Sequence, residues 1–224
     1  MEEYGNDLLV LVRRRSEHAP EQKKNGMPDP EKEKLLGEGF SRMGWPPYDP
    51  DRISRTRTGK PYVTDPQVPG EFNYSDTDTC CAAAFGSAAV GIDIEEIRKP
   101  PVHLLRRLPE EERRYLHGTS DPAERNYRFV RIWTAKEAFG KMQGTGLTKE
   151  ILETDFTRGT GGVIPVKAFS VTADTLAVRM TPVRVMLCGT ACLFGCCDAG
   201  AAVISVCMKI QEPHCGGPVS VSGF

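Results

Sequence analysis

The chain has 224 residues, which suits one large domain or two small packed ones. Hydrophobic residues make up 39% and charged residues 26% of it, a mixture typical of a globular protein with a sizeable core. The formal net charge of −1 disfavours a nucleic-acid-binding protein, because such proteins carry a basic field.

Membrane insertion and secretion are both disfavoured by the sequence. The longest apolar stretch, residues 201–208, is far shorter than the roughly 20 residues that a membrane span needs. The N-terminus places acids before a short apolar run, whereas a secretory signal begins with cations and has a longer run. We therefore expect a cytoplasmic protein with no membrane association.

The eight cysteines are expected to be reduced in that compartment and to serve as small core residues. Four of them cluster, which raises zinc binding as the less favoured alternative. The cluster lacks the CxxC pair and the nearby histidine that a zinc finger needs. Its members are Cys188, Cys192, Cys196 and Cys197.

The first part of the chain alternates irregular and regular segments. Residues 13–34 are charged and broken by prolines, which predicts a loop or a poorly ordered segment. Residues 35–43 place Leu35, Leu36 and Phe40 at helical spacing. Residues 58–69 are rich in turn residues, and two strands are predicted around residues 72–75 and 82–90.

The second part begins with a strand whose apolar and acidic residues alternate. In residues 91–97 the isoleucines face one way, while Asp93 and Glu95 face the other. One or two short helices follow in residues 103–117. Residues 126–143 form the clearest predicted helix, with an apolar stripe and glycines after its end. Short β-branched runs then predict strands at residues 169–173, 176–180, 183–188 and 201–208.

Asp93 and Glu95 are the first candidates for chemistry. Two residues apart on one strand, their carboxylates project from the same face, with Cβ atoms roughly 6 to 7 Å apart. Two such oxygen donors can share a hard cation such as Mg²⁺. A solvated strand face with incidental acids explains the pair equally simply, and the spacing alone favours that explanation.

The helix of residues 126–143 carries the second group of candidates. Glu137 and Lys141 are four residues apart and share a helix face, and Lys136 is rotated by about 100° from Glu137. Glu137 could add a third carboxylate to the metal, and the lysines could bind phosphate oxygens. An ordinary surface Glu–Lys pair is the commoner explanation of this spacing.

Taken together, the two motifs favour the functional explanation over the structural one. The residues G-I-D-I-E (91–95), W-T-A-K-E-A-F-G-K (133–141) and G-T-G-L (144–147) resemble the motifs of the surfactin-type (Sfp-like) 4′-phosphopantetheinyl transferases. Three upstream stretches also match this family in order: L-L-G-E-G-F-S-R (35–42), T-G-K-P-Y (58–62) and F-N-Y-S-D-T (72–77). The ordered matches extend over about residues 35 to 147.

The resemblance implies an α+β fold made of two similar halves related by pseudo-twofold symmetry. The halves would be residues 1–88 and residues 89–224, the second carrying the acidic strand and the KEA helix. The coenzyme would lie in the cleft between them. The resemblance also implies a monomer, a pseudo-dimer in one chain.

The implied activity transfers the 4′-phosphopantetheine group of coenzyme A to a serine of an acyl or peptidyl carrier protein and releases 3′,5′-ADP. Mg²⁺, with Mn²⁺ as an alternative, would be held by Asp93, Glu95 and Glu137. Lys141 would stabilise charge on the transferred phosphate, and Glu137 could also act as the base for the serine. Coenzyme contacts are expected from Lys60, Ser75, Asp76, Lys136 and Lys141.

The sequence departs from the family pattern at two places. Asp76 stands where the family usually has histidine, so an acid replaces a phosphate contact and should weaken binding of an anionic coenzyme unless it is neutralised. The basic residues before residue 35 do not align with the family's 3′-phosphate ligands; among them are Arg13, Arg15, Lys23 and Lys32. Glu112 matches a family position close to the site.

Two alternative functions follow from these departures and from the chemistry of the carboxylates. One is a divalent-metal phosphohydrolase that uses the same acids on coenzyme A or nucleotides without a carrier protein. The other is a degenerate protein that binds coenzyme A or a carrier but transfers nothing.

Overall fold

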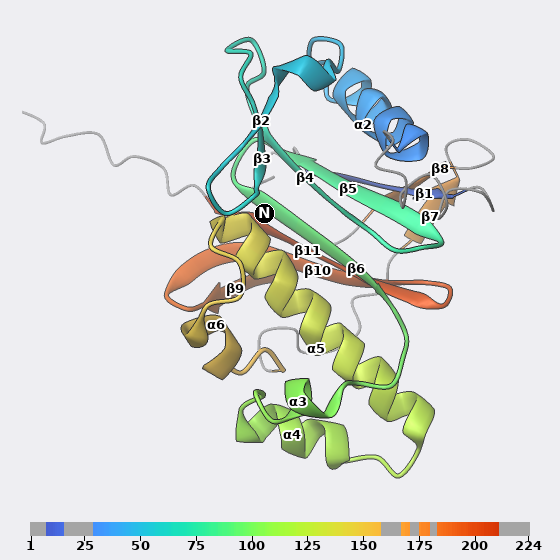
Figure 1. Ribbon diagram of the computed structural model, residues 1–224, viewed down its shortest axis with the longest axis vertical. Helices are drawn as coiled ribbons and strands as arrows, with labels where there is room; N and C mark the ends of the chain where they lie inside the picture. The colour runs from blue at the N-terminus through green and yellow to red at the C-terminus, as the bar shows by residue number, and fades with distance from the viewer. Residues whose placement is uncertain (1–7, 16–28, 158–166, 171–174, 180–182, 211–224) are drawn as a thin grey trace, which may run out of the picture.

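Two antiparallel β-sheets, each covered by a helix, make up the α+β architecture of this chain (Figure 1). The computed structural model of the protein describes residues 8–15, 29–157, 167–170, 175–179 and 183–210. None of the helices in these residues is both long and apolar enough to cross a membrane. The mixture of sheets and helices confirms the predicted α+β class.

The first sheet has five strands, and helix α2 (Pro30–Arg42) covers one of its faces. In spatial order the strands are β4 (Glu71–Asp76), β5 (Cys80–Gly86), β1 (Leu9–Arg14), β8 (Thr175–Arg179) and β7 (Lys167–Ser170). Helix α2 begins at Pro30 because the Asp29 carboxylate accepts hydrogen bonds from the backbone N–H groups of Glu31 and Lys32.

The second sheet has four strands, and the long helix α5 (Pro122–Gln143) lies across it. In spatial order the strands are β6 (Val90–Glu96), β11 (Ala202–Lys209), β10 (Thr190–Ala199) and β9 (Val183–Leu187). Helix α5 begins after the capping carboxylate of Asp121 and ends at Gly144, whose φ of 71° requires a residue that tolerates the left-handed region.

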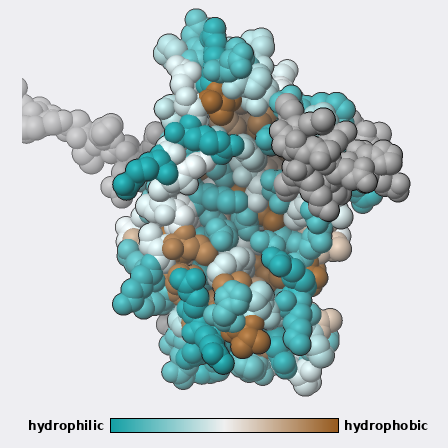
Figure 2. Space-filling view, viewed as in Figure 1, coloured by the Kyte–Doolittle hydropathy of each residue, from teal (hydrophilic) through white to brown (hydrophobic). Residues whose placement is uncertain are grey.

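Smaller elements surround these two layers. They are η1 (Pro50–Arg52), the hairpin of β2 (Ile53–Arg55) and β3 (Pro61–Val63), α3 (Val102–Leu105), α4 (Glu110–His117) and α6 (Lys149–Glu153). Figure 1 places α3 and α4 beside the first turns of α5, whereas α2 lies at the other end of the molecule. The face seen in Figure 2 is mostly hydrophilic, with hydrophobic side chains gathered in small separate patches.

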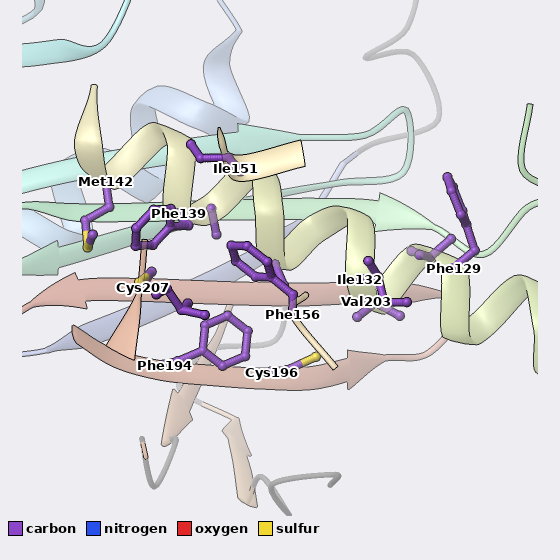
Figure 3. Packing of buried hydrophobic residues seen from close by; sticks show 14 of the residues in the cluster. Phe129, Ile132, Phe139, Met142, Ile151, Phe156, Phe194, Cys196, Val203 and Cys207 are labelled. Atoms are coloured by element: carbon purple, nitrogen blue, oxygen red, sulfur yellow. The ribbon is translucent and has the colours of Figure 1, made fainter. Parts of the chain in front are cut away.

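Strand alternation divides the core into three clusters. In β1, Val10 and Val12 face the second sheet, and Leu11 faces α2. In β6, Ile92 and Ile94 face the first sheet, so the two sheets bury one face of each against the other. The third cluster lies between the second sheet and the helices α4, α5 and α6, with Phe139, Phe156 and Phe194 near its centre (Figure 3).

The two parts of the chain share one order of connections. A strand, a helix and an antiparallel hairpin follow one another as β1, α2, β4 and β5, and again as β6, α5, β10 and β11. This order is what two similar halves would give, although the pseudo-twofold relation stays a prediction. The proposed boundary at residue 88 falls between β5 and β6, but β7 and β8 return to the first sheet and pair beside β1.

Several local predictions were wrong or incomplete. Residues 13 and 14 belong to β1 and residues 30–34 to α2, so the prediction of a loop was wrong for these residues; residues 16–28 lie outside the described residues. Strand β10 was not predicted. Ile97 lies beyond the end of β6 and is 37% exposed, so it does not continue the buried face.

The described cysteines are free, and all except Cys188 are buried. Cys192, Cys196 and Cys197 lie in β10, and Cys215 lies outside the described residues. Among the described side chains no group of three such ligands could hold a metal ion. Cys192 and Cys196 pack in the cluster beneath the helices and Cys197 packs between the sheets, whereas Cys188 is only half-buried.

Candidate active site

The candidate site lies where the end strand of each sheet meets the other. Strand β4 is the last strand of the first sheet and β6 the last of the second. The side chain of Asn73 accepts a hydrogen bond from the backbone N–H of Ile92 at 3.2 Å, which satisfies a donor on the unpaired edge of β6. Two residues further along β4, the Ser75 hydroxyl donates to Oδ1 of Asp93 at 2.8 Å.

Helix α5 brings the third element to this point. Nζ of Lys141 donates to Oδ1 of Asp93 at 2.7 Å and to Oγ of Ser75 at 2.9 Å. Only 7% of the Asp93 side chain is exposed, and burial raises the pKa of this carboxyl, opposed by the charge of Lys141 and by the hydrogen bonds from Lys141 and Ser75. Three residues distant in sequence therefore form one polar triangle.

Glu137 lies one turn before Lys141 on the same helix face. Burial first, and then the negative charges of Asp93 and Glu95, raise the pKa of its carboxyl to about 7, although the positive charge of Lys141 partly opposes them. Glu95 itself forms an ion pair with Arg98 at 3.0 Å. The three predicted carboxylates are thus near enough for their charges to act on one another.

The close approach of β6 and α5 depends on Gly91. A Cβ atom at this position would lie 2.1 Å from the backbone oxygen of Ala138 and 2.3 Å from the backbone nitrogen of Met142. Any larger residue would push the helix away from the strand. The glycine of the G-I-D-I-E motif therefore lets α5 lie directly on the strand that carries Asp93.

A pocket of about 220 Å³ opens beside the triangle and is lined by both parts of the chain. Arg55, Lys60, Asn73 and Tyr74 line it from the first part, and Lys141 with Gly140, Gly144 and Gly146 from α5 and the turn after it. Lys60 donates to Glu71 at 2.6 Å and to the backbone oxygen of Met142 at 3.1 Å. The turn that carries Lys60 is therefore fastened to the end of α5.

Asp76 is neutralised by a neighbouring cation. Its Oδ2 accepts from Nη2 of Arg15 at 3.0 Å, and Arg15 also pairs with Asp29. The Arg15 side chain is only 1% exposed. The acid that replaces the family's histidine is therefore held in an ion pair. Arg13, the neighbouring basic residue on β1, bonds Glu31 and Thr175; Lys23 lies outside the described residues.

The prediction for Lys136 as a phosphate ligand does not agree with the structure. Its side chain is fully buried and pairs with Glu112 at 3.0 Å. Nζ also donates to the backbone oxygens of Ile151 at 2.9 Å and Leu152 at 3.3 Å, and it lies 4.6 Å from the centre of the Phe156 ring. Lys136 and Glu112 therefore join α5 to α4 and α6 inside the core, because a rotation of about 100° from Glu137 turns Lys136 away from the cleft.

The carboxylates fit a hard divalent cation in their chemistry. No three acidic, histidine or cysteine side chains among the described residues converge tightly enough, as they lie, to hold a metal ion. Oδ1 of Asp93 is bonded by Lys141 and Ser75, and Glu95 by Arg98. However, Oδ2 of Asp93 is buried and has no hydrogen-bond partner within the described residues. A buried orphan oxygen among three carboxylates is a donor set that suits Mg²⁺.

Several residues of the site were not predicted from sequence. Asn73 belongs to the F-N-Y-S stretch, but only its place opposite the edge of β6 reveals what it bonds. Arg55 and Tyr74 line the pocket and bond each other through a guanidinium and a hydroxyl. Nothing in the local sequence distinguishes Arg15 or Arg55 from the many other arginines of this chain.

Comparison with known proteins agrees with this geometry. Residues 89–181 match the family model of the 4'-phosphopantetheinyl transferase superfamily. The 4'-phosphopantetheinyl transferase psf-1 of Bacillus pumilus is 38% identical over 92 residues, which cover 40% of this chain and 38% of the relative. The 4'-phosphopantetheinyl transferase Sfp of Bacillus subtilis is 31% identical over 98 residues, covering 43% of each chain.

A putative 4'-phosphopantetheinyl transferase of Haemophilus influenzae is 33% identical over 105 residues, which cover 44% of this chain and 43% of the relative. The family model and these relatives show a similarity of this part of the chain, residues 89–181, to 4'-phosphopantetheinyl transferases. These matches span about two fifths of the length of the curated relatives, 38% of psf-1 and 43% of Sfp. Asp93, Glu95, Glu137 and Lys141 all lie inside the matched residues.

Proposed function

We propose that this protein transfers the 4′-phosphopantetheine group of coenzyme A to a serine of an acyl or peptidyl carrier protein and releases 3′,5′-ADP. The observation that carries the proposal is the polar triangle of Ser75, Asp93 and Lys141, with Glu137 beside it. The triangle joins both sheets and α5 next to a pocket that both parts of the chain line. The superfamily match of residues 89–181 supports the same chemistry.

In this proposal Asp93, Glu95 and Glu137 hold Mg²⁺, for which Mn²⁺ can substitute. A bound divalent cation supplies positive charge against the pyrophosphate of coenzyme A. Lys141 donates hydrogen bonds to oxygens of the transferred phosphate, and Lys60 and Ser75 contact the coenzyme from the facing wall. Phosphoryl transfer needs mainly alignment and charge neutralisation, which these side chains provide.

Glu137 is suited to accept the proton of the attacking serine hydroxyl. A carboxyl whose pKa is about 7 is both available as a base and able to hold a proton near neutral pH. As the serine oxygen bonds to the β-phosphorus of coenzyme A, the bond from that phosphorus to the bridging oxygen breaks. The serine proton moves to Glu137, and 3′,5′-ADP leaves with the bridging oxygen.

The partners follow from the same proposal: coenzyme A, a carrier protein or carrier domain, and no nucleic acid or membrane. We also propose a monomer that acts in the cytoplasm. The degenerate-binder alternative was motivated by Asp76, and the ion pair between Asp76 and Arg15 weakens that motive, because the pair offsets the negative charge. The phosphohydrolase alternative differs from transfer in needing no carrier protein.

Mass spectrometry distinguishes the three functions. Apo carrier proteins are incubated with the protein, coenzyme A and Mg²⁺, and their masses are measured. We expect a gain equal to one phosphopantetheine group on the carrier. Breakdown of coenzyme A without a carrier would favour the phosphohydrolase, and no gain on any carrier by a folded protein that binds coenzyme A would favour the degenerate binder.

The matched control for this assay is a pair of aspartate variants. Asp93→Asn removes a charge from the triangle, whereas Asp51→Asn makes the same change at an exposed position in η1. We expect the first variant to transfer nothing measurable and the second to transfer like the wild type.

A further inference from the structure

One buried polar contact joins α5 to the second sheet beneath the carboxylates. Oγ1 of Thr134 and Oγ of Ser205 lie 2.8 Å apart, and both side chains are fully buried. The surrounding interface is apolar and includes Ala135, Ala138 and Val203. A hydroxyl pair in such a place needs an explanation, because apolar residues of the same shape would pack there equally well.

The contact lies beside the site on both of its elements. Ser205 of β11 is the register partner of Asp93 on β6, so the two side chains point to the same face of the sheet, toward α5. On α5, Glu137 and Ala138 lie three and four residues after Thr134, and Lys141 lies four and three residues after them, so all four lie along one stripe of the helix. The hydroxyl pair therefore connects the turn before Glu137 to the residue opposite Asp93.

A second fixed point lies on the other side of Glu137. There the absence of a side chain at Gly91 lets β6 touch the backbone of Ala138 and Met142. A close approach alone does not stop a helix from sliding or rotating over a strand. A hydrogen bond with defined partners opposes such movement, because sliding would leave both hydroxyls with poorer partners in the core.

We infer that Thr134 and Ser205 are positioning residues that set the axial position and rotation of α5, and thereby the distance between Glu137 and Asp93 at the metal site. This inference rests on the proposed function, since it assigns a metal to these carboxylates. It concerns the hydroxyl groups alone, and neither residue touches the substrate.

The following variants distinguish an effect on the position of α5 from an effect on the stability of the protein. Thr134→Val and Ser205→Ala each remove one hydroxyl. In Ser205→Ala the remaining Thr134 keeps its bond to the backbone oxygen of Arg131 at 3.2 Å, and in Thr134→Val the remaining Ser205 lies opposite Cys196, its register partner on β10. The double variant replaces both hydroxyls by apolar groups, a change that is nearly neutral for folding. Thr134→Ser keeps the hydroxyl and tests for rescue.

Thr190→Val is the matched control. It removes another side-chain hydrogen bond between α5 and the second sheet, in which Gln143 donates to Thr190 at 2.9 Å. The chemical change is the same as at Thr134, but the lost bond lies beyond Lys141, at the last residue of α5.

Binding of Mn²⁺ to each full-length protein is measured by electron paramagnetic resonance at pH 8, together with Tm. We expect Thr134→Val, Ser205→Ala and the double variant each to raise the Kd for Mn²⁺ by about tenfold, the lower end of what outer residues of metal sites contribute. The double variant should be no worse than either single variant, because the bond between Thr134 and Ser205 is already lost in each single variant. Thr134→Ser and Thr190→Val should stay within about twofold of the wild type.

A folded double variant that binds Mn²⁺ like the wild type would overturn the inference, and so would an equal loss in Thr190→Val. A wild-type protein that binds no Mn²⁺ would overturn it together with the metal site. A wild-type protein that binds Mn²⁺ but modifies no carrier would count against the proposed function and leave the comparison of Kd values standing.

Discussion

Helix α5 places two lysines against two buried carboxylates. The two pairs carry the same charges but differ in their location, their exposure and their other hydrogen bonds. The cleft pair, Asp93 and Lys141, lies where α5 meets the end strands β4 and β6, and 29% of the lysine side chain is exposed. The core pair, Glu112 and Lys136, is fully buried, and backbone carbonyls accept the other hydrogen bonds of the lysine. Burial raises the pKa of both carboxyls.

The difference shows that the two lysines of the W-T-A-K-E-A-F-G-K motif have different roles. In the core pair the donors of the lysine are taken up by protein oxygens, so none remains for a ligand. In the cleft pair Lys141 lines the pocket and bonds side chains only. A lysine whose hydrogen bonds go to backbone oxygens, such as Lys136, has a structural role. A lysine that pairs with a carboxylate at the wall of a pocket, such as Lys141, can exchange this partner for a phosphate.

The strongest test of this comparison is Asp93→Ala. We expect the transfer rate to fall by about a thousandfold, because the variant loses a carboxylate that the proposed metal site needs. We expect no loss of Tm, since burial already disfavours the charged carboxylate in the folded state. Steady-state transfer and thermal unfolding check both parts.

Asp51→Ala serves as the control, because Asp51 is exposed. An Asp93→Ala variant that transfers near the wild-type rate with Mg²⁺ would show that the cleft pair is structural, as the core pair is.

For the core pair we expect the opposite result: Lys136→Met should lower the stability of the protein. Removing one partner of a buried ion pair leaves Glu112 uncompensated, and we expect the free energy of unfolding to fall by about 3 to 5 kcal/mol. Urea unfolding measures this change. Lys149→Met is the control, because Lys149 is 85% exposed.

Lys136→Met combined with Glu112→Gln should regain much of the stability, because the glutamine can still accept from the backbone N–H of Phe156, which Glu112 does at 2.8 Å. This double variant should also transfer normally. If it is stable but binds coenzyme A poorly, Lys136 is a phosphate ligand after all.

The pH dependence should separate the two regions further, because the pKa values of Glu137 and Glu112 are both raised to about 7. Glu137 must be unprotonated to hold a metal or to accept a proton. Because its pKa is raised, it keeps its proton as pH falls below 7, so kcat/KM should rise with pH. Between pH 5.5 and pH 8 we expect a gain of about thirtyfold.

The profile is measured for the wild type and for the double variant that lacks the charges of the core pair. The two profiles should coincide, since only the cleft carboxyl takes part in transfer. A shift of the midpoint in the double variant would show that Glu112 contributes to the rate.

The smallest effect is expected for Lys60→Ala. Lys60 lines the pocket but also pairs with Glu71, which is partly exposed. Loss of one cation whose charge is already offset by Glu71 should raise the KM for coenzyme A by about fivefold and leave kcat unchanged. Lys149→Ala is the control. An unchanged KM would assign Lys60 only to fastening its turn on α5.

The parts of the site that sequence predicted are those with a local period. The alternation of β6 placed Asp93 opposite the buried Ile92 and Ile94, and the helical spacing placed Glu137 and Lys141 on one face. The α+β class followed from the same periods. The same helical geometry turns Lys136 by about 100° from Glu137, but only the tertiary structure shows that this direction leads into the core.

What the sequence could not predict depends on contacts between distant segments. The ion pair of Arg15 with Asp76 joins β1 to the last residue of β4, and Thr134 meets Ser205 across the helix–sheet interface. Strand β10 escaped prediction because its glycine and cysteines give no clear alternation of polar and apolar residues. Strand β1 was missed because it precedes a charged run that dominates the local composition.

The return of β7 and β8 to the first sheet has a consequence for synthesis. Val10 of β1 pairs with Val178 of β8, so β1 keeps one side unpaired until β8 has left the ribosome. Until then its row of backbone donors and acceptors is open to other chains. Completion of the first sheet is therefore a late, long-range step, and a nascent chain halted before residue 175 should aggregate more readily than the finished protein.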